Sequence, residues 1–269
     1  MRSWKNRSCM YLVYALAGAF LAWSLFVFLY QYMAGFGMAK SIFAAFKNPR
    51  ILMALWLSIT SACVTAIIAL IFGVPLAYFF AVKEFRGKIL LATLTIDVPQ
   101  TFPPIAEGII LLLMLGPQSP FNINIAYTFA ALVIAKLYVC APFVIALTLR
   151  RFKEIQESGI DLTARSLGAT PFQVFRSIFI PMAFKDTMAG VALCWARAMG
   201  ELGGSLIFAG IIPFKTEDIP TYISVVAETD MASALAATML VTTASILALL
   251  FFKVITPGSA LWKAFFYKV

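Results

Sequence analysis

Long apolar runs constrain this chain more than any other feature of its sequence. Hydrophobic residues make up 62% of the 269 positions and charged residues only 12%, and the mean hydropathy is +0.93. A helix needs about 20 apolar residues to cross the bilayer core. The sequence therefore predicts an all-α polytopic membrane protein. Its six expected transmembrane helices cover roughly residues 10–33, 51–82, 89–115, 125–149, 185–212 and 231–256.

Lysine and arginine are distributed unevenly between the predicted loops. With the N-terminus inside, fifteen of them face the cytoplasm, whereas Lys40, Lys47, Arg50 and Lys215 face outward. Loops rich in Lys and Arg stay on the cytoplasmic side. We therefore expect both termini and the loop of about residues 150–184 to be cytoplasmic. The net charge of +9 follows from this bias, and the sequence offers no basic soluble region that would hold a nucleic acid.

The residue types that bind metals and nucleotides are sparse. Cys9, Cys63, Cys140 and Cys194 lie far apart, and the sequence contains no histidine. Disulfide frameworks and His/Cys metal sites are therefore not expected. The sequence also lacks the phosphate-binding loop Gly-x-x-x-x-Gly-Lys-Ser/Thr. We expect no cofactor in this chain, and any nucleotide chemistry must come from another one.

A polar and basic segment, Ser158–Pro181, separates the fourth and fifth apolar runs. We expect two short helices here. Ser158 is expected to cap the first helix, and Gly168 to end it in the left-handed conformation. Thr170 and Pro171 would begin the second helix, with Gln173 completing a capping box. The apolar side chains of both helices would form a docking surface, although an ordinary amphipathic cytoplasmic loop is the alternative. They are Leu162, Ala164, Leu167, Phe172, Phe175, Ile178 and Phe179.

The third apolar run is interrupted within Ile96–Gly108. This stretch contains Pro99, Pro103, Pro104, Asp97 and Glu107. Broken backbone is tolerated at membrane depth only where it is buried in protein or lines a wet cavity. We therefore expect the stretch to face the interior of the helix bundle. In the alternative interpretation the span begins after Pro104, and the earlier residues lie at the inner interface.

The fifth apolar run carries two opposite charges. Arg197 and Glu201 are four residues apart, and on one helix they would share a face with Gly204, Ser205 and Phe208. A lone charge at the bilayer centre costs at least about 3 kcal/mol. We therefore expect the two residues to pair and to face inward. The pair would either line a translocation path or lock adjacent helices together.

Two other polar features fall in or beside apolar runs. Lys136 lies midway along the fourth run, so it should face a partner or a cavity rather than lipid. The outer loop Pro213–Pro220 is expected either to be solvated or to receive an extracellular partner. In the tail, Trp262–Val269, aromatic residues and lysines are typical of a membrane interface.

Three motifs in this order resemble one family of membrane proteins. The spacing from Ala164 through Gly168 to Ile178–Pro181 is similar to the EAA loop of ABC importer permeases, with Leu162 and Thr163 in place of its Glu and first Ala. Asp97–Pro104 ahead of Gly108, and Trp-Ala-Arg-x-x-Gly-Glu-x-Gly at Trp195–Gly203, complete the set. Together they look like permeases of the molybdate, tungstate and sulfate ABC importers, and most like the molybdate/tungstate permease.

The resemblance implies a single permease domain over residues 1–269, in a prokaryotic cell membrane. Two copies would form a homodimer with two ATPase subunits, which bind ATP and Mg, and an external oxyanion-binding protein would deliver the substrate. The chain itself would not be an enzyme. The residues expected to couple to the ATPase are Asp161, Ala164, Arg165, Leu167, Gly168, Ala169, Ile178 and Pro181. Those expected along the translocation path are Pro103, Pro104, Arg197, Gly200, Glu201, Gly204 and Ser205.

Other functions are left open by the residues. A sulfate or thiosulfate permease would carry the same motifs. A secondary transporter driven by an ion gradient often shows inverted repeats, which the hydropathy pattern does not. An intramembrane enzyme would use Asp97, Glu107 and Glu201, but no nucleophile and base are readable around them.

Overall fold

The chain is mainly helical within residues 2–255, the part that this computed structural model describes; the side chains of residues 2–9, Ser41 and Ile255 are not described. The expected interface tail, Trp262–Val269, lies outside these residues. Within them no β-strand occurs. The α-helices are α1 (Arg2–Gly37), α2 (Ala39–Phe46), α3 (Pro49–Val82), α4 (Lys88–Ile96), α5 (Val98–Thr101), α6 (Pro104–Leu115), α7 (Phe129–Glu157), α8 (Ile160–Ser166), α9 (Pro171–Val174), α10 (Ile180–Met199), α11 (Ile219–Val226) and α12 (Met231–Ile255). Two π-helical turns are η1 (Phe175–Phe179) and η2 (Ser205–Ala209).

Most of the predicted spans correspond to one long helix each. Five helices are long and apolar enough to cross a membrane. The third predicted span is instead a bent pair, Lys88–Thr101 and Pro104–Leu115, whose two parts meet at 116°. The interruption expected within Ile96–Gly108 is therefore confirmed, and helix lies on both sides of it. The five helices are Met10–Gly37, Pro49–Val82, Phe129–Glu157, Pro171–Met199 and Met231–Val254.

Helices α3, α7 and α10 pack against one another at the centre of the bundle. Small residues permit this close packing, as is usual between membrane helices. A β-carbon built on Gly190 of α10 would lie 2.9 Å from the carbonyl oxygen of Phe143 in α7. Helix α3 contributes a stripe of small buried residues that includes Ala54, Ser58, Ser61, Ala62, Thr65, Ala66, Ala69, Gly73 and Ala77.

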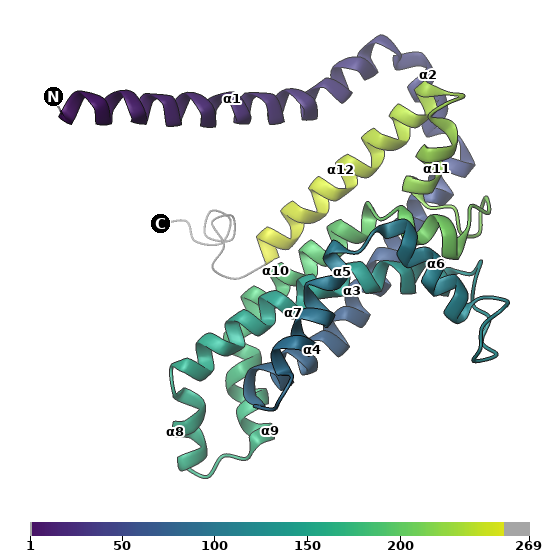
Figure 1. The fold of residues 1–269 in the computed structure, drawn as a ribbon. Coiled ribbons are helices and arrows are strands. Elements are labelled where there is room, and N and C mark those ends of the chain that lie inside the picture. The colour runs from purple at the N-terminus through teal and green to yellow at the C-terminus, as the bar shows by residue number, and fades with distance from the viewer. Residues whose placement is uncertain (1, 256–269) are drawn as a thin grey trace.

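Helix α1 projects away from the bundle and touches α2 and α12 near its end (Figure 1). Its side chains from Met10 onward are mostly exposed within this single chain. Helix α12 runs beside α10, α11 and α2. Asp230 caps α12 by accepting hydrogen bonds from the Ser233 hydroxyl (2.5 Å) and backbone N–H (3.1 Å), which lower the pKa of the Asp230 carboxyl.

The fifth span differs from the sequence prediction in both of its boundaries. It begins at Pro171 and ends at Met199, instead of covering residues 185–212. The expected face shared by Arg197, Glu201 and Phe208 on one continuous helix was therefore wrong. Glycine is the poorest helix former after proline, and the sequence after Met199 contains Gly200, Gly203 and Gly204. The chain turns there before η2 begins.

The polar segment between α7 and α10 is also built differently from the prediction. Ser158 ends α7 and donates its hydroxyl to the carbonyl oxygen of Ile155 (2.6 Å), so the expectation that it caps α8 was wrong. Gly159, with φ +74°, occupies the N-cap of α8 instead. The second helix is not short, because α9 continues through η1 into α10. Pro181 lacks the N–H that an α-helical bond to residue 177 needs, and a π-helical turn lies immediately before it.

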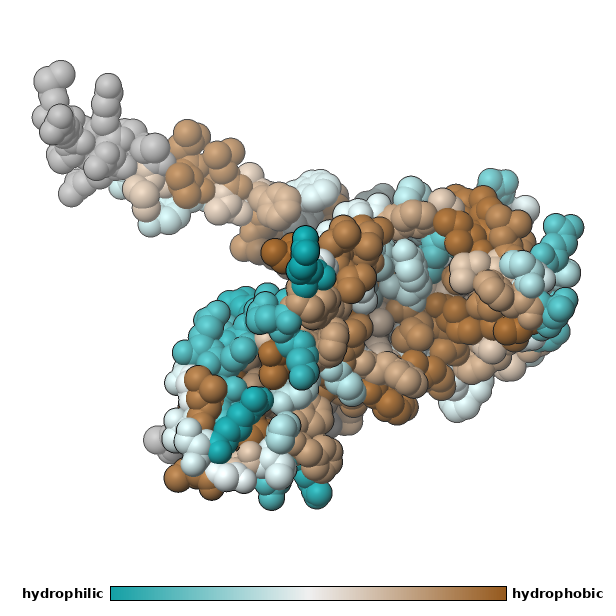
Figure 2. All heavy atoms as spheres, turned by 60° about the horizontal axis from the view of Figure 1, so that its bottom comes forward, coloured by the Kyte–Doolittle hydropathy of each residue, from teal (hydrophilic) through white to brown (hydrophobic). Residues whose placement is uncertain are grey.

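Figure 2 shows how the surface divides between apolar and polar regions. On the face shown, apolar side chains cover most of the bundle. Hydrophilic side chains gather, interleaved with apolar ones, at the end of the bundle that carries α8 and α9 in Figure 1. This end combines the polarity of a membrane-external segment with exposed apolar side chains.

Candidate translocation site and coupling loop

Two broken spans meet at one place in the bundle. The start of α6, which follows the bend at Pro103, packs against the turn that follows α10. A β-carbon on Gly203 would lie 2.4 Å from Cβ of Pro104, and one on Gly108 would lie 2.8 Å from Cβ of Ile207. The two backbones can approach this closely only because these positions are glycine. We call this contact between α6 and residues 200–205 the joint.

Arg197 and Glu201 form an ion pair at the joint. Nη1 of Arg197 lies 2.7 Å from Oε2 of Glu201, and Oε1 of Glu201 accepts hydrogen bonds from the backbone N–H groups of Gly203 (3.1 Å) and Gly204 (3.4 Å). The Glu201 side chain is 1% exposed, whereas that of Arg197 is 37% exposed. The expected pairing is confirmed, although Glu201 lies beyond the helix end. The buried carboxylate is compensated by one cation and two N–H groups, as a buried charge requires.

Glu107 is a second carboxyl group at the joint. It lies in the first turn of α6 and is 2% exposed. A β-carbon on Gly204 would lie 3.3 Å from its Oε1 atom. Among the described residues, neither carboxyl oxygen of Glu107 has a hydrogen-bond partner. The sequence identified Glu107 as part of the interrupted span and as one acid of the intramembrane-enzyme alternative; three-dimensional packing is what brings it to Gly204, beside Glu201.

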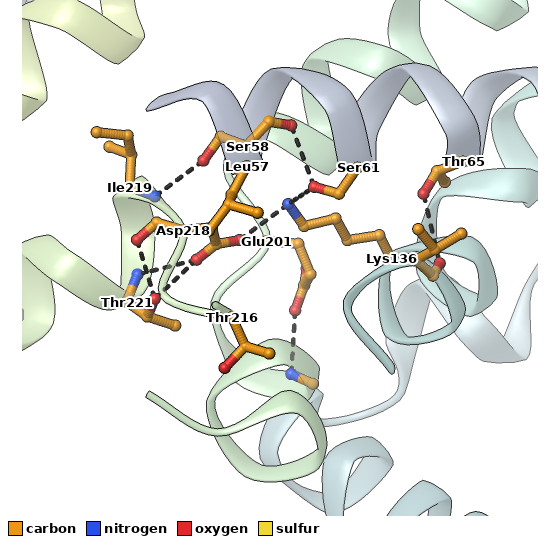
Figure 3. A network of polar contacts seen from close by, with 12 residues as sticks. Leu57, Ser58, Ser61, Thr65, Lys136, Glu201, Thr216, Asp218, Ile219 and Thr221 are labelled. Atoms are coloured by element: carbon orange, nitrogen blue, oxygen red, sulfur yellow. Dashed lines mark hydrogen bonds and ion pairs between the residues drawn. The ribbon is translucent and has the colours of Figure 1, made fainter. Parts of the chain in front are cut away.

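Lys136 pairs with a residue of the loop Pro213–Pro220, which the bias of Lys and Arg predicts to be the outer loop (Figure 3). Its Nζ atom lies 2.8 Å from Oδ2 of Asp218 and donates to the Ser61 hydroxyl at 2.7 Å, and Lys136 and Asp218 are both fully buried. Ser58 Oγ accepts the backbone N–H of Ile219 at 2.8 Å. These contacts tie α3, α7 and the start of α11 together. We call this cluster of Ser58, Ser61, Lys136, Asp218 and Ile219 the lock.

The outer loop is held by a second ion pair beside the lock. The Arg50 guanidinium donates to both carboxylate oxygens of Glu217, at 2.7 and 2.5 Å, and lies 5.4 Å above the Tyr222 ring. Thr216, Glu217 and Asp218 are all buried. The expectation of a solvated loop over Pro213–Pro220 was therefore wrong for its second half. Spacing alone could not reveal this, because paired and solvated acids look the same in a sequence.

The structure brings together most of the residues predicted for the translocation path. Pro104, Glu201, Gly204 and Ser205 meet at the joint, with Arg197 at its partly exposed edge. Gly200 and Pro103 are exposed beside it, while Gly204 and Ser205 are buried. Lys136 belongs to the lock instead. In the described residues no group of three or more His, Cys, Asp and Glu side chains could hold a metal ion.

The segment α8–α9 has the capping geometry that the sequence predicts. Gly168 has φ +91°, its N–H donates to Arg165 O (2.9 Å), and Ala169 N–H donates to Ala164 O (3.0 Å), which together close a Schellman motif. Thr170 and Gln173 form the capping box. One cap ends α8 and the other begins α9, so local hydrogen bonds set the shape of the turn between the two helices.

The side chains of this hairpin divide between an outer and an inner face. Leu162, Leu167 and Phe172 are 64%, 85% and 67% exposed. Phe179, expected on the docking surface, is fully buried and packs edge-on against Phe152. Ala164, Ala169 and Ile178 pack partly against the core. The buried atoms Asp161 Oδ1 and Arg165 Nε have no hydrogen-bond partner within the described part of the chain.

These features define a multi-pass membrane protein with ion pairs inside its helix bundle and an exposed hairpin at one end. Residues 69–260 match the family described as "binding-protein-dependent transport system inner membrane component". The match covers more than half of the chain, and the chain belongs to this family.

Several curated relatives are permeases of oxyanion transport systems. The chain is 39% identical over 162 residues to a molybdate/tungstate transport system permease of Thermococcus kodakarensis, covering 60% of this chain and 62% of the relative. It thus spans about three fifths of the length of that relative. It is 33% identical over 204 residues to the Pyrococcus furiosus counterpart, covering 74% and 78%. A sulfate transport system permease of Escherichia coli is 32% identical over 183 residues, covering 65% and 62%.

Solved structures share the fold at low sequence identity. One is a bacterial ABC transporter involved in the import of the acidic polysaccharide alginate (TM-score 0.71, 17% identity, 94% of this chain and 97% of that chain). Another is the inward-facing methionine ABC transporter MetNI (TM-score 0.59, 16% identity, 77% and 94%). At this identity the likeness concerns the fold alone.

Proposed function

We propose that this chain is the membrane-spanning permease subunit of an ATP-driven importer of molybdate or tungstate. The names of the archaeal relatives support the substrate class. The observation that carries the mechanism is the α8–α9 hairpin, which displays Leu162, Leu167 and Phe172 at the end of the bundle. Exposed apolar side chains next to a polar surface are typical of a site that binds another protein.

The partner at this hairpin would be an ATPase subunit. The residues proposed to couple the two proteins are those of the EAA-like segment: Asp161, Ala164, Arg165, Leu167, Gly168, Ala169, Ile178 and Pro181. Because α9 continues without interruption into α10, a movement of the hairpin would be transmitted along α10 to Arg197. Free energy passes between the two proteins only if the hairpin binds the ATPase differently in its two states.

The other partners follow from the same proposal. Two copies of the chain would form a homodimer with two ATPase subunits, and a periplasmic or extracellular oxyanion-binding protein would supply the substrate. A solved alginate transporter of this fold is in complex with a periplasmic protein. The hairpin and both termini would be cytoplasmic, as the bias of Lys and Arg predicts.

The joint is the proposed translocation site. Arg197 is the partly exposed cation there, and Glu201 offsets its charge. A site that bound a dianion tightly would oppose its release, so transport favours weak contacts along the path. Specificity would then reside mainly in the external binding protein. A purified permease that by itself bound molybdate at submicromolar affinity would contradict this weak-binding path.

A sulfate permease is the second candidate, because a sulfate permease of Escherichia coli is also a relative. The test is uptake into proteoliposomes that hold the permease, its ATPase and its binding protein. We expect ATP-dependent uptake of molybdate or tungstate that excess sulfate does not suppress. Preferential uptake of sulfate would show that sulfate, and not molybdate or tungstate, is the substrate. Uptake driven by an ion gradient without ATP would show that the protein is a secondary transporter and not an ATP-driven importer.

A further inference from the structure

The joint holds two buried carboxyl groups but only one cation. Glu201 has Arg197 and two backbone N–H groups as partners. Glu107 is buried to the same degree, and neither of its oxygens is hydrogen-bonded within residues 2–255. A buried polar group without a partner is costly, and native structures rarely keep one without a reason. This imbalance distinguishes the joint from the lock, in which every charge is paired.

Glu107 lies within electrostatic reach of the ion pair. Burial is the largest influence on its carboxyl group, and the charges of Glu201 and Arg197 also act on it. Its Oε1 atom packs on Gly204, the residue whose N–H binds Glu201. A β-carbon at position 204 would lie 3.3 Å from this oxygen and 3.1 Å from Cβ of Ala135, so glycine gives the carboxyl group the most room there. Glu107 is therefore the second buried acid at the joint, and no side chain at 204 separates it from Glu201.

Arg197 is less enclosed by the surrounding protein than Glu201 is. Its side chain is 37% exposed, in contrast to the 1% of Glu201. It lies in the last turn of α10, and Glu107 lies in the first turn of α6. A cation at a helix C-terminus and an acid at a helix N-terminus are each favoured by the helix dipole. Both groups thus keep a favourable position whichever carboxylate the guanidinium contacts.

We propose that Glu107 is the alternate partner of Arg197: the guanidinium pairs with Glu201 in the conformation seen here and with Glu107 in a second conformation of the transport cycle. The exchange links α10, which continues into the coupling hairpin, to α6, which follows the bend of the third span. Two packings of the joint with different ion pairs would make a two-state element. The assignment extends the proposed function, since the joint is the proposed path.

A mutant cycle tests the exchange without any transport assay. Glu107→Gln, Glu201→Gln and the double variant would be compared by thermal unfolding of the assembled permease complex. Glu107→Gln alone should leave the unfolding temperature nearly unchanged, because no partner is lost in this conformation. In the Glu201→Gln background Arg197 depends on Glu107, so adding Glu107→Gln should lower the unfolding temperature by a further 2–4 °C or so. Equal effects of Glu107→Gln in both backgrounds would overturn the proposal.

The second measurement is oxyanion uptake by the Glu107→Gln complex. It can be made even if the complexes that carry Glu201→Gln, alone or in the double variant, do not assemble. We expect oxyanion uptake to fall by at least about fivefold with an unchanged unfolding temperature, because one state of the cycle loses its ion pair. Asp97→Asn is the matched control, since Asp97 is an exposed acid in the same bent span. Uptake at the parent rate in Glu107→Gln would contradict the exchange.

The two measurements separate this proposal from the proposed function. Should the unsubstituted complex transport no oxyanion, the substrate assignment fails while the mutant cycle still reports on Arg197. Should the cycle prove additive in a complex that transports oxyanion, only the exchange fails.

Discussion

The lock and the joint are two charged clusters in one bundle, and they are built in opposite ways. In the lock, Lys136 and Asp218 are both fully buried, and a serine hydroxyl accepts a second hydrogen bond from the lysine. At the joint, the cation is partly exposed, one acid lacks a partner in the described residues, and glycines line the contact. A satisfied buried network favours one arrangement. A network with an unpaired acid beside glycine residues permits more than one arrangement, as a moving part of the protein requires.

The largest expected effect comes from breaking the lock. Lys136→Met leaves the Asp218 carboxylate without its cation in a fully buried site, which costs about 3–5 kcal/mol of stability. The free energy or temperature of unfolding of the purified permease measures it. Lys215→Met, which removes an exposed lysine from the same outer loop, is the control and should change little. A Lys136→Met variant as stable as the control would mean that the lock is not the rigid cluster.

The second largest effect is expected from adding a methyl group at the joint. Gly203→Ala places a β-carbon where only 2.4 Å separate it from Pro104, and overpacking of this kind costs about 1–3 kcal/mol. We also expect reduced uptake, because α6 must shift to make room. Gly18→Ala, at a helical site with no atom within 4 Å, is the control for both assays. Equal behaviour of the two alanine variants would argue against close contact at the joint.

Removal of Glu201 should destabilise less than removal of Lys136. Glu201→Ala takes the carboxylate from Arg197, but the surrounding chain leaves this guanidinium 37% exposed, so we expect a loss of about 1–2 kcal/mol. Measuring the free energy of unfolding of the Glu201→Ala and Lys136→Met variants under the same conditions shows which loss of stability is larger. A loss as large as that of Lys136→Met would show that the joint is as rigid as the lock.

The smallest expected effect is that of removing the Ser61 hydroxyl from the lock. Ser61→Ala removes the 2.7 Å hydrogen bond from Lys136 but leaves the ion pair with Asp218, at a cost of about 1 kcal/mol. Ser24→Ala is the matched control, since Ser24 bonds only a carbonyl of its own exposed helix at 2.9 Å. If both serine variants unfold at the same temperature, Ser61 adds nothing to the lock.

The sequence predicted the parts of both clusters that depend on local spacing. Arg197 and Glu201 are four residues apart, and the pair forms although the helix ends at Met199 between them. Lys136, midway along an apolar run, correctly indicated that a partner was needed. Apolar runs and caps depend on neighbours along the chain, so most of the spans and the caps at Gly168 and Thr170 could be predicted as well, whereas the bounds of the fifth span and the start of α8 were not.

The rest depended on contacts between distant segments. Asp218 pairs with a lysine 82 residues away, as the difference between positions 218 and 136 shows, and no pattern near Asp218 distinguishes it from a solvated acid. Glu107 comes close to Gly204, whose N–H binds Glu201, only because the start of α6 packs against the turn after α10. One signal was available for the break in the fifth span: three glycines within five residues, Gly200 to Gly204, make a continuous helix there unfavourable.

If the joint is a moving part and the lock a rigid one, the two should differ in how far they move in the assembled transporter. Spin labels at Ile110 of α6 and Leu193 of α10, both partly exposed, would report the joint, and labels at Trp56 of α3 and Tyr138 of α7 would report the lock. Pulsed electron resonance would give both distances with and without bound ATP. We predict that ATP changes the distance across the joint and leaves the distance across the lock the same. An unchanged joint, or an equal shift in both pairs, would contradict the account.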